Sequence, residues 1–98
     1  MLSTFPSQEK ACQIGTLLVE KQLAACVNVS SEVVSIYRWK GEICRETEVQ
    51  GSFKVAEKRF PDFVAALREF HPYEVPEILA VPVAEGDPDY LAWVRKGG

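Results

Sequence analysis

The sequence predicts an α+β fold in which two helices cover one face of an antiparallel sheet. Apolar residues recur at helical spacing in two stretches, residues 8–23 and 60–70. Two long strand-like stretches, residues 24–39 and 42–55, are separated by a short glycine turn, which predicts a hairpin. One further strand is expected before the first helical stretch and another after the second. The element order is therefore β-α-β-β-α-β, followed by a short helix.

The first strand and the first helix are read from residues 1–23. Residues 1–5 are the end of a strand, and Ser7 is the expected N-cap of a helix that ends near Gln22 or Leu23. Glu9 lies in the first turn, where a negative charge suits the helix dipole. The apolar face of this helix is formed by Ala11, Ile14, Leu17, Leu18 and Leu23.

The central hairpin comes next. Its first strand is expected to be interrupted at residues 30–32 by a bulge or bend, and Gly41 supplies the positive φ of the tight turn. The return strand alternates with a period of two, which predicts one buried and one wet face. The face expected to be buried holds Ile43, Arg45, Thr47, Val49, Gly51, Phe53 and Val55. The face expected to be wet holds Cys44, Glu46, Glu48, Gln50, Ser52 and Lys54. Gly51 marks a bulge or a close backbone approach.

The second half of the chain repeats the pattern. Pro61 is placed at the first position of a helix, and its apolar stripe, which we read as core packing, is Phe60, Phe63, Val64, Leu67 and Phe70. A strand over residues 77–83 follows, and Asp87 is the expected N-cap of a terminal helix from Pro88 to about residue 95. The whole pattern is the ferredoxin-like split βαβ arrangement, in one domain spanning residues 1–98.

Composition excludes several classes of partner. The chain has 11 basic and 14 acidic residues, a net charge of −3, and no basic stripe, so no nucleic-acid partner is expected. No apolar run approaches the roughly 20 residues of a membrane span, and the N-terminal residues lack the features of a signal peptide. Three widely spaced cysteines, Cys12, Cys26 and Cys44, indicate no disulfide framework and favour a reducing cytoplasm.

The hairpin is too long for a domain of this size. Its return strand of 14 residues would span about 45 Å, whereas a 98-residue domain spans about 30–35 Å. Tyr37, Trp39 and Ile43 lie near the tip, and exposed aromatic residues are typical of interfaces. We therefore expect a closed oligomer in which Trp39 and Ile43 contact a neighbour. The alternative is a hairpin coiled back over its own sheet.

The connection after the second helix carries the candidate binding groups. His71, the only histidine, lies with Glu74 and Glu77 in a segment stiffened by prolines. His71 and Glu74 are the candidate metal ligands, although no two donors have the spacing of a closed metal motif. The site could also be completed across an interface by a carboxylate or Cys44 of a neighbour. The structural alternative is that His71 only interacts with the last carbonyls of the helix.

Catalysis has little support, because the chain has no nucleophile elbow, no Ser-x-x-Lys motif and no glycine-rich phosphate loop. A cleft between subunits is a further expectation. Tyr37, Trp39, Lys54 and Tyr73 would line it, and it would hold a small anion or metabolite. Lys54 has the simpler alternative of being a solvated strand lysine.

Four segments in order resemble the CutA family of divalent-cation-tolerance proteins. They are residues 23–29 (LAACVNV), 35–42 (SIYRWKGE), 71–77 (HPYEVPE) and 86–94 (GDPDYLAWV). The resemblance implies a ferredoxin-like protomer in a homotrimer similar in architecture to the PII signalling proteins. It also implies a non-enzymatic role in tolerance of, or response to, divalent metal ions, with no required cofactor and with Cu(II) or another divalent cation as ligand.

The chain departs from some bacterial members of that family at two positions. Ser3 stands where they carry a cysteine, and Phe70 stands where they carry the first of two histidines. Two of the three metal ligands suggested for those members are therefore absent. Three functions remain open: a trimeric metal-response protein that binds divalent cations weakly or at an interface, a PII-like sensor of a small ligand, and a structural trimer that serves an unseen partner.

Overall fold

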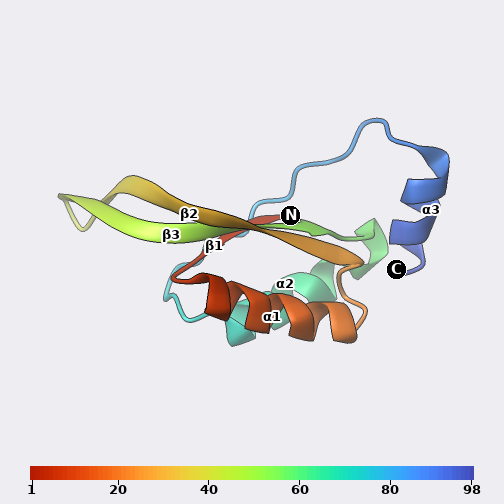
Figure 1. Cartoon of the computed structure of the whole chain (residues 1–98), viewed down its shortest axis with the longest axis horizontal. Coiled ribbons are helices and arrows are strands. Elements are labelled where there is room, and N and C mark those ends of the chain that lie inside the picture. Colours follow the sequence, from red (N-terminus) through yellow and green to blue (C-terminus); the bar gives the residue numbers. More distant parts are fainter.

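The computed structural model describes residues 1–98 and has the expected α+β architecture. Three antiparallel strands lie in the order β1-β3-β2, and α1 and α2 cover one face of the sheet (Figure 1). The elements are β1 (Leu2–Phe5), α1 (Gln8–Glu20), β2 (Cys26–Trp39), β3 (Glu42–Lys54), a 3-10 turn (Glu57–Arg59), α2 (Phe60–Phe70) and α3 (Pro88–Arg95). No helix is both long enough and apolar enough to span a membrane.

The two central strands form one continuous hairpin. Their pairing runs from Cys26 opposite Lys54 to Trp39 opposite Glu42, and the register shifts between Val29 and Glu32, which confirms the predicted bulge. Residues 40 and 41 form the turn with φ values of 50° and 83°. Glycine adopts positive φ without steric cost, which accounts for Gly41 at the second turn position.

The outer part of the hairpin projects beyond the rest of the molecule. The last pair between β1 and β3 is Phe5 with Val49, so residues 33–48, here called the hairpin arm, have no third strand beside them. The arm extends past α1 and α2 at the left of Figure 1, and the molecule measures 45 × 25 × 23 Å. The hairpin is therefore extended, and it does not coil back over its own sheet.

Burial along β3 differs from the prediction at the arm. Val49, Gly51 and Phe53 are buried as expected, but the outer members of the same face are exposed because no helix covers them: Ile43, Arg45 and Thr47. On the opposite face, Glu48 was expected to be wet and is 8% exposed. Tyr73, in the segment after α2, contacts its carboxylate.

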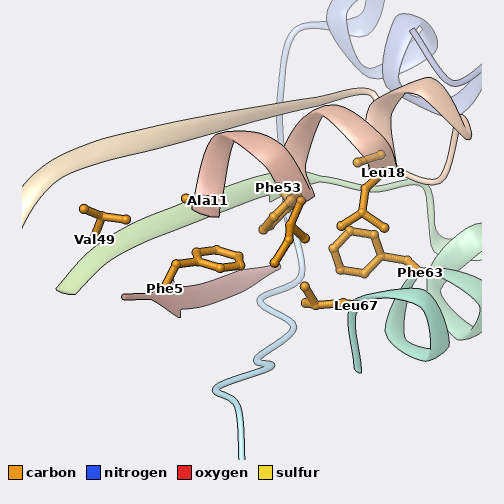
Figure 2. Packing of buried hydrophobic residues seen from close by; sticks show 9 residues of the cluster. Phe5, Ala11, Leu18, Val49, Phe53, Phe63 and Leu67 are labelled. Carbon is orange, nitrogen blue, oxygen red and sulfur yellow. The ribbon is translucent and has the colours of Figure 1, made fainter. Parts of the chain in front are cut away.

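The core fills the space between the sheet and the two helices. Phe53 and Phe63 meet edge to face with ring centroids 5.1 Å apart, and Phe5 lies 6.3 Å from Phe53 (Figure 2). Gly51 is the close backbone approach that the sequence allowed for, since a Cβ there would lie 2.8 Å from the Phe5 ring. Leu18 and Leu67 complete the contact from α1 and α2.

Both predicted N-caps are confirmed. The Ser7 hydroxyl accepts a hydrogen bond from the backbone N–H of Lys10 at 3.1 Å, and the Asp87 carboxylate accepts one from Tyr90 at 3.0 Å. α1 ends at Glu20, earlier than expected, because Gln22 adopts a left-handed conformation with φ 57°.

The predicted strand over residues 77–83 is wrong as a strand. Only one antiparallel bridge forms, in which Leu2 and Leu79 exchange backbone hydrogen bonds of 2.8 and 3.1 Å. In this register the next hydrogen-bonded pair would be Thr4 with Glu77, but the Thr4 carbonyl accepts a hydrogen bond from Nε2 of His71 instead. The bridge still places this segment beside β1, where the ferredoxin-like arrangement has its fourth strand.

Candidate functional site

His71 lies at the end of α2 with its ring inside the molecule. Its backbone N–H closes the helix by donating to Leu67 at 2.9 Å, and its backbone then turns to an extended conformation before Pro72. The side chain is 7% exposed, and its ring stacks on Phe5 with centroids 4.9 Å apart and an angle of 18°. His71 is therefore packed against the core.

Both nitrogens of the His71 ring have hydrogen-bond partners. Nδ1 accepts from the backbone N–H of Tyr73 at 3.1 Å, so Nε2 carries the proton and donates it to the Thr4 carbonyl at 2.8 Å. The Ser3 hydroxyl lies 3.3 Å from Nε2. Burial lowers the pKa of His71 below its ordinary value of 6.5, and the Thr4 hydrogen bond and the charge of Glu48 oppose this effect.

Tyr73 and Glu48 form the second part of the site. The Tyr73 hydroxyl donates a 2.6 Å hydrogen bond to Oε2 of Glu48, across 25 residues of sequence. Burial raises the pKa of Tyr73 far above 10, and the hydrogen bond to the Glu48 carboxylate adds to the shift. The ring of Tyr73 also lies against His71, with centroids 4.8 Å apart. Sequence reasoning missed Glu48, because its contact with Tyr73 is long-range and no local pattern marks it.

An open groove of about 660 Å³ runs between the hairpin arm and the connection after α2. Its aromatic lining is Tyr37, Trp39 and Tyr73, and its acidic lining is Glu48, Glu74 and Glu77. The structure thus brings three of the four predicted cleft residues together with one candidate metal ligand. Since both walls come from one chain, this groove does not require a neighbour to exist.

The remaining sequence candidates lie elsewhere. Lys54 is not part of the groove lining, and its ammonium group donates to the Asn28 side-chain carbonyl on the neighbouring strand. Ile43 is 64% exposed near the tip of the hairpin arm. The aromatic cleft therefore lacks the cationic group that was expected to hold an anion.

The residues of one chain do not fit a closed metal site. His71 offers no free lone pair unless its hydrogen bond to Tyr73 or to Thr4 breaks. Glu74 is exposed, and no three His, Cys, Asp or Glu side chains converge on a point that could hold an ion. The three cysteines are free thiols.

Comparison with known proteins gives consistent matches along almost the whole chain. Residues 1–97 match the family model described as "CutA1 divalent ion tolerance protein". The "Divalent-cation tolerance protein CutA" of Thermus thermophilus is 45% identical over 96 residues, which cover 98% of this chain and 93% of the relative. The solved structure of the Thermus thermophilus protein superimposes with a TM-score of 0.94.

Two further solved structures are similar in fold. One, from Archaeoglobus fulgidus, is described as a periplasmic divalent cation tolerance protein and has 33% identity and a TM-score of 0.93 over 98% of this chain and 93% of its own. The other, from Nostoc, is described as a PII-like protein and has 37% identity and a TM-score of 0.91 over 98% of this chain and 92% of its own.

Proposed function

Because the chain belongs to the CutA1 divalent ion tolerance protein family, we propose that it acts in divalent metal ion tolerance or response as a non-enzymatic homotrimer. Divalent cations such as Cu(II) bind it weakly or at a subunit interface, and no cofactor is required. The cytoplasm is the proposed compartment, because the three cysteines are unpaired thiols.

The hairpin arm is the observation that carries the proposed assembly. It presents apolar side chains that its own chain leaves exposed, including Val34, Ile36 and Ile43, beside unpaired strand edges. Monomeric proteins rarely expose such a surface, and unpaired edges favour pairing with another chain. A trimer in which each arm reaches a neighbour would cover this surface.

The proposed metal binding follows from where the donors lie. Cys44 on the arm and Glu74 beside the groove are accessible to a neighbouring subunit, whereas His71 is held by hydrogen bonds within its own chain. Donors that do not converge in one chain favour weak binding or a shared site. The same hydrogen bonds support a non-enzymatic role, because the only imidazole is committed to holding the fold.

Native mass spectrometry with and without added Cu(II) tests this function. We expect a particle of about three times the 11.0 kDa chain mass, with copper uptake that falls in Cys44→Ser or Glu74→Gln. The matched control is Cys12→Ser, because Cys12 is exposed on α1, outside the hairpin arm and the groove lining. A monomer would refute the assembly, and a trimer whose copper uptake is the same in all variants would refute the metal assignment.

A second candidate function is that of a PII-like sensor of a small molecule. The observation that favours it is the aromatic groove, because concave sites with a few polar groups are the usual sites of small ligands. A rise in melting temperature with a metabolite, together with indifference to divalent cations, would favour this function. Absence of both responses would leave a structural trimer that serves a partner.

A further inference from the structure

The charges that line the groove are all of one sign. Glu48, Glu74 and Glu77 contribute three carboxylates, and no lysine or arginine is among the lining residues. The negative potential extends over both walls of the groove. Burial raises the pKa of Tyr37 on the arm and of Tyr73 opposite it, and the charges of Glu46 and Glu48 add to both shifts. An anion would therefore be repelled, and a cation would be attracted.

Glu48 is the innermost of these carboxylates and is more than nine-tenths buried. It accepts one hydrogen bond, from the Tyr73 hydroxyl to Oε2. Glutamate this deeply buried is nearly always paired with a cation, because the desolvation of an isolated carboxylate is costly. No lysine or arginine is among the groove-lining residues, so the Tyr73 hydroxyl is the partner of this carboxylate within the groove.

Aromatic rings supply the rest of the wall. Tyr37 and Trp39 are about two-fifths exposed, and they lie on the arm opposite Tyr73. The ammonium group of Lys40 already lies 5.9 Å from the centre of the Trp39 ring, within the range of a cation–π contact. Trp39 therefore presents a ring face of the kind that attracts a cation, and the same side chain borders the groove.

The kind of cation follows from how the carboxylates are spaced. They do not converge as metal ligands, and the groove of about 660 Å³ is large enough for a whole small organic molecule. Aromatic rings with dispersed carboxylates are the chemistry that recognises a substituted ammonium or guanidinium group. We propose that the groove between the hairpin arm and the connection after α2 binds a small organic cation of this class.

This inference specifies the ligand class of the second candidate function and does not depend on metal binding. The probe is benzyltrimethylammonium, and benzenesulfonate is the anionic control of similar ring size. Trp39 reports binding by fluorescence in a Trp93→Phe background, which leaves it as the only tryptophan. We expect saturable binding of the cation, at least about tenfold tighter than that of benzenesulfonate.

Three variants locate the site. Glu48→Gln should weaken binding of the cation by about tenfold, since it removes a desolvated charge. Tyr37→Leu should weaken it by about threefold through loss of a cation–π contact. Glu74→Gln, which changes an exposed carboxylate and carries less risk to folding, should weaken it by about twofold to fivefold. The matched control is Glu57→Gln, in the 3-10 turn and absent from the groove lining, and it should bind as the parent does.

Several results would overturn the inference. The first is that benzenesulfonate binds as tightly as benzyltrimethylammonium. The second is that Glu48→Gln and Glu74→Gln bind the cation with the same affinity as the parent. A third is a Glu48→Gln protein that falls apart into monomers by native mass spectrometry, which would assign the partner of Glu48 to a neighbouring copy. Copper uptake and oligomeric mass are read separately, so failure of the metal function and failure of the groove site are distinguishable.

Discussion

His71 connects three parts of the chain through its ring and backbone. Its backbone N–H donates the last hydrogen bond of α2. Its Nε2–H donates to the Thr4 carbonyl of β1, and its Nδ1 accepts from the backbone N–H of Tyr73. Tyr73 in turn holds Glu48 of β3. The conformation of the connection beside the groove therefore depends on a neutral imidazole with the proton on Nε2.

The pH dependence of stability follows from this tautomer. Because burial lowers the pKa of His71 in the folded protein, the unfolded chain binds this proton more readily. The stabilisation is complete above the unfolded pKa of about 6.5, and it declines as the pH falls through that value toward the folded pKa. Urea unfolding at about pH 7.5 and about pH 5.5 should show a larger loss for the parent than for His71→Gln. Equal losses would show that His71 does not titrate on unfolding.

The Tyr73 hydroxyl is expected to stabilise the fold through Glu48. Tyr73→Phe removes the hydrogen bond to a buried carboxylate and should lower the free energy of unfolding by about 1–3 kcal/mol. The measurement is chemical denaturation. Tyr37→Phe is the control from the same groove, because its hydroxyl makes no hydrogen bond, and it should leave the free energy of unfolding nearly unchanged. Similar losses in both variants would contradict the assignment.

At the scale of elements, β3 is the central strand, and Gly51 lies where Phe5 of β1 and Phe53 of β3 close over its backbone. The sequence marked this glycine as unusual, and the structure gives the reason as ring packing instead of a bulge. A methyl group at this position would lie 2.8 Å from one ring and 3.2 Å from the other. The close packing of β1 on β3 therefore requires glycine here.

Gly51→Ala is expected to destabilise the protein by about 1–3 kcal/mol, because two core rings must shift. Thermal unfolding followed by circular dichroism measures the effect. Ser52→Ala, next along β3 and half-buried, is the matched control and should be close to neutral. If Gly51→Ala proved as stable as the control, the rings would have room that the packing does not show.

Elements set by local chemistry could be predicted from the sequence, and those set by distant contacts could not. The caps at Ser7 and Asp87 and the turn at Gly41 each depend on a few neighbouring residues, and all three were correct. The strand over residues 77–83 failed, because an apolar run indicates strand formation without showing whether an edge can accept it. The prediction that Glu48 is exposed to solvent was wrong for a related reason. Strand alternation assigns a side chain to a face of the sheet but does not show which segment covers that face.

For the candidate site, the groove-lining aromatic residues could be predicted from the sequence, but their position relative to Lys54 could not. Tyr37, Trp39 and Tyr73 do line one groove, which lies between the hairpin arm and the connection after α2. Lys54 was expected beside them by strand face alone, yet it lies toward the other end of β3. Strand alternation predicts the face on which a side chain lies, whereas the residues that it meets there depend on tertiary structure.

At the scale of the whole molecule, the arm makes the surface unusual. Only 17 of 98 residues are buried, and residues 80–90 are exposed throughout, including Val81 and Val83. A chain of this size is only marginally able to bury its own apolar side chains. Association would add the burial that the single chain lacks, which is the physical argument for the proposed trimer.

Ile43→Asp is expected to weaken the proposed trimer, because it places a charge on an apolar part of the arm. Sedimentation velocity at micromolar concentration should show smaller species for this variant. Gln13→Asp, an exposed change on α1, should leave the sedimentation coefficient unaltered. A trimer that survives Ile43→Asp without loss of melting temperature would place the interface elsewhere.

The arm also has a consequence for local opening of the backbone. Its two strands share a full ladder of pairs, yet few of its side chains are buried and no helix lies over its outer part. Backbone amides protected only by such a ladder exchange their hydrogens with solvent by fraying that starts at the turn. In an isolated chain, exchange should slow steadily from residue 42 toward Val49, so a flat, strongly protected profile along the arm would be a direct sign that another chain lies over it.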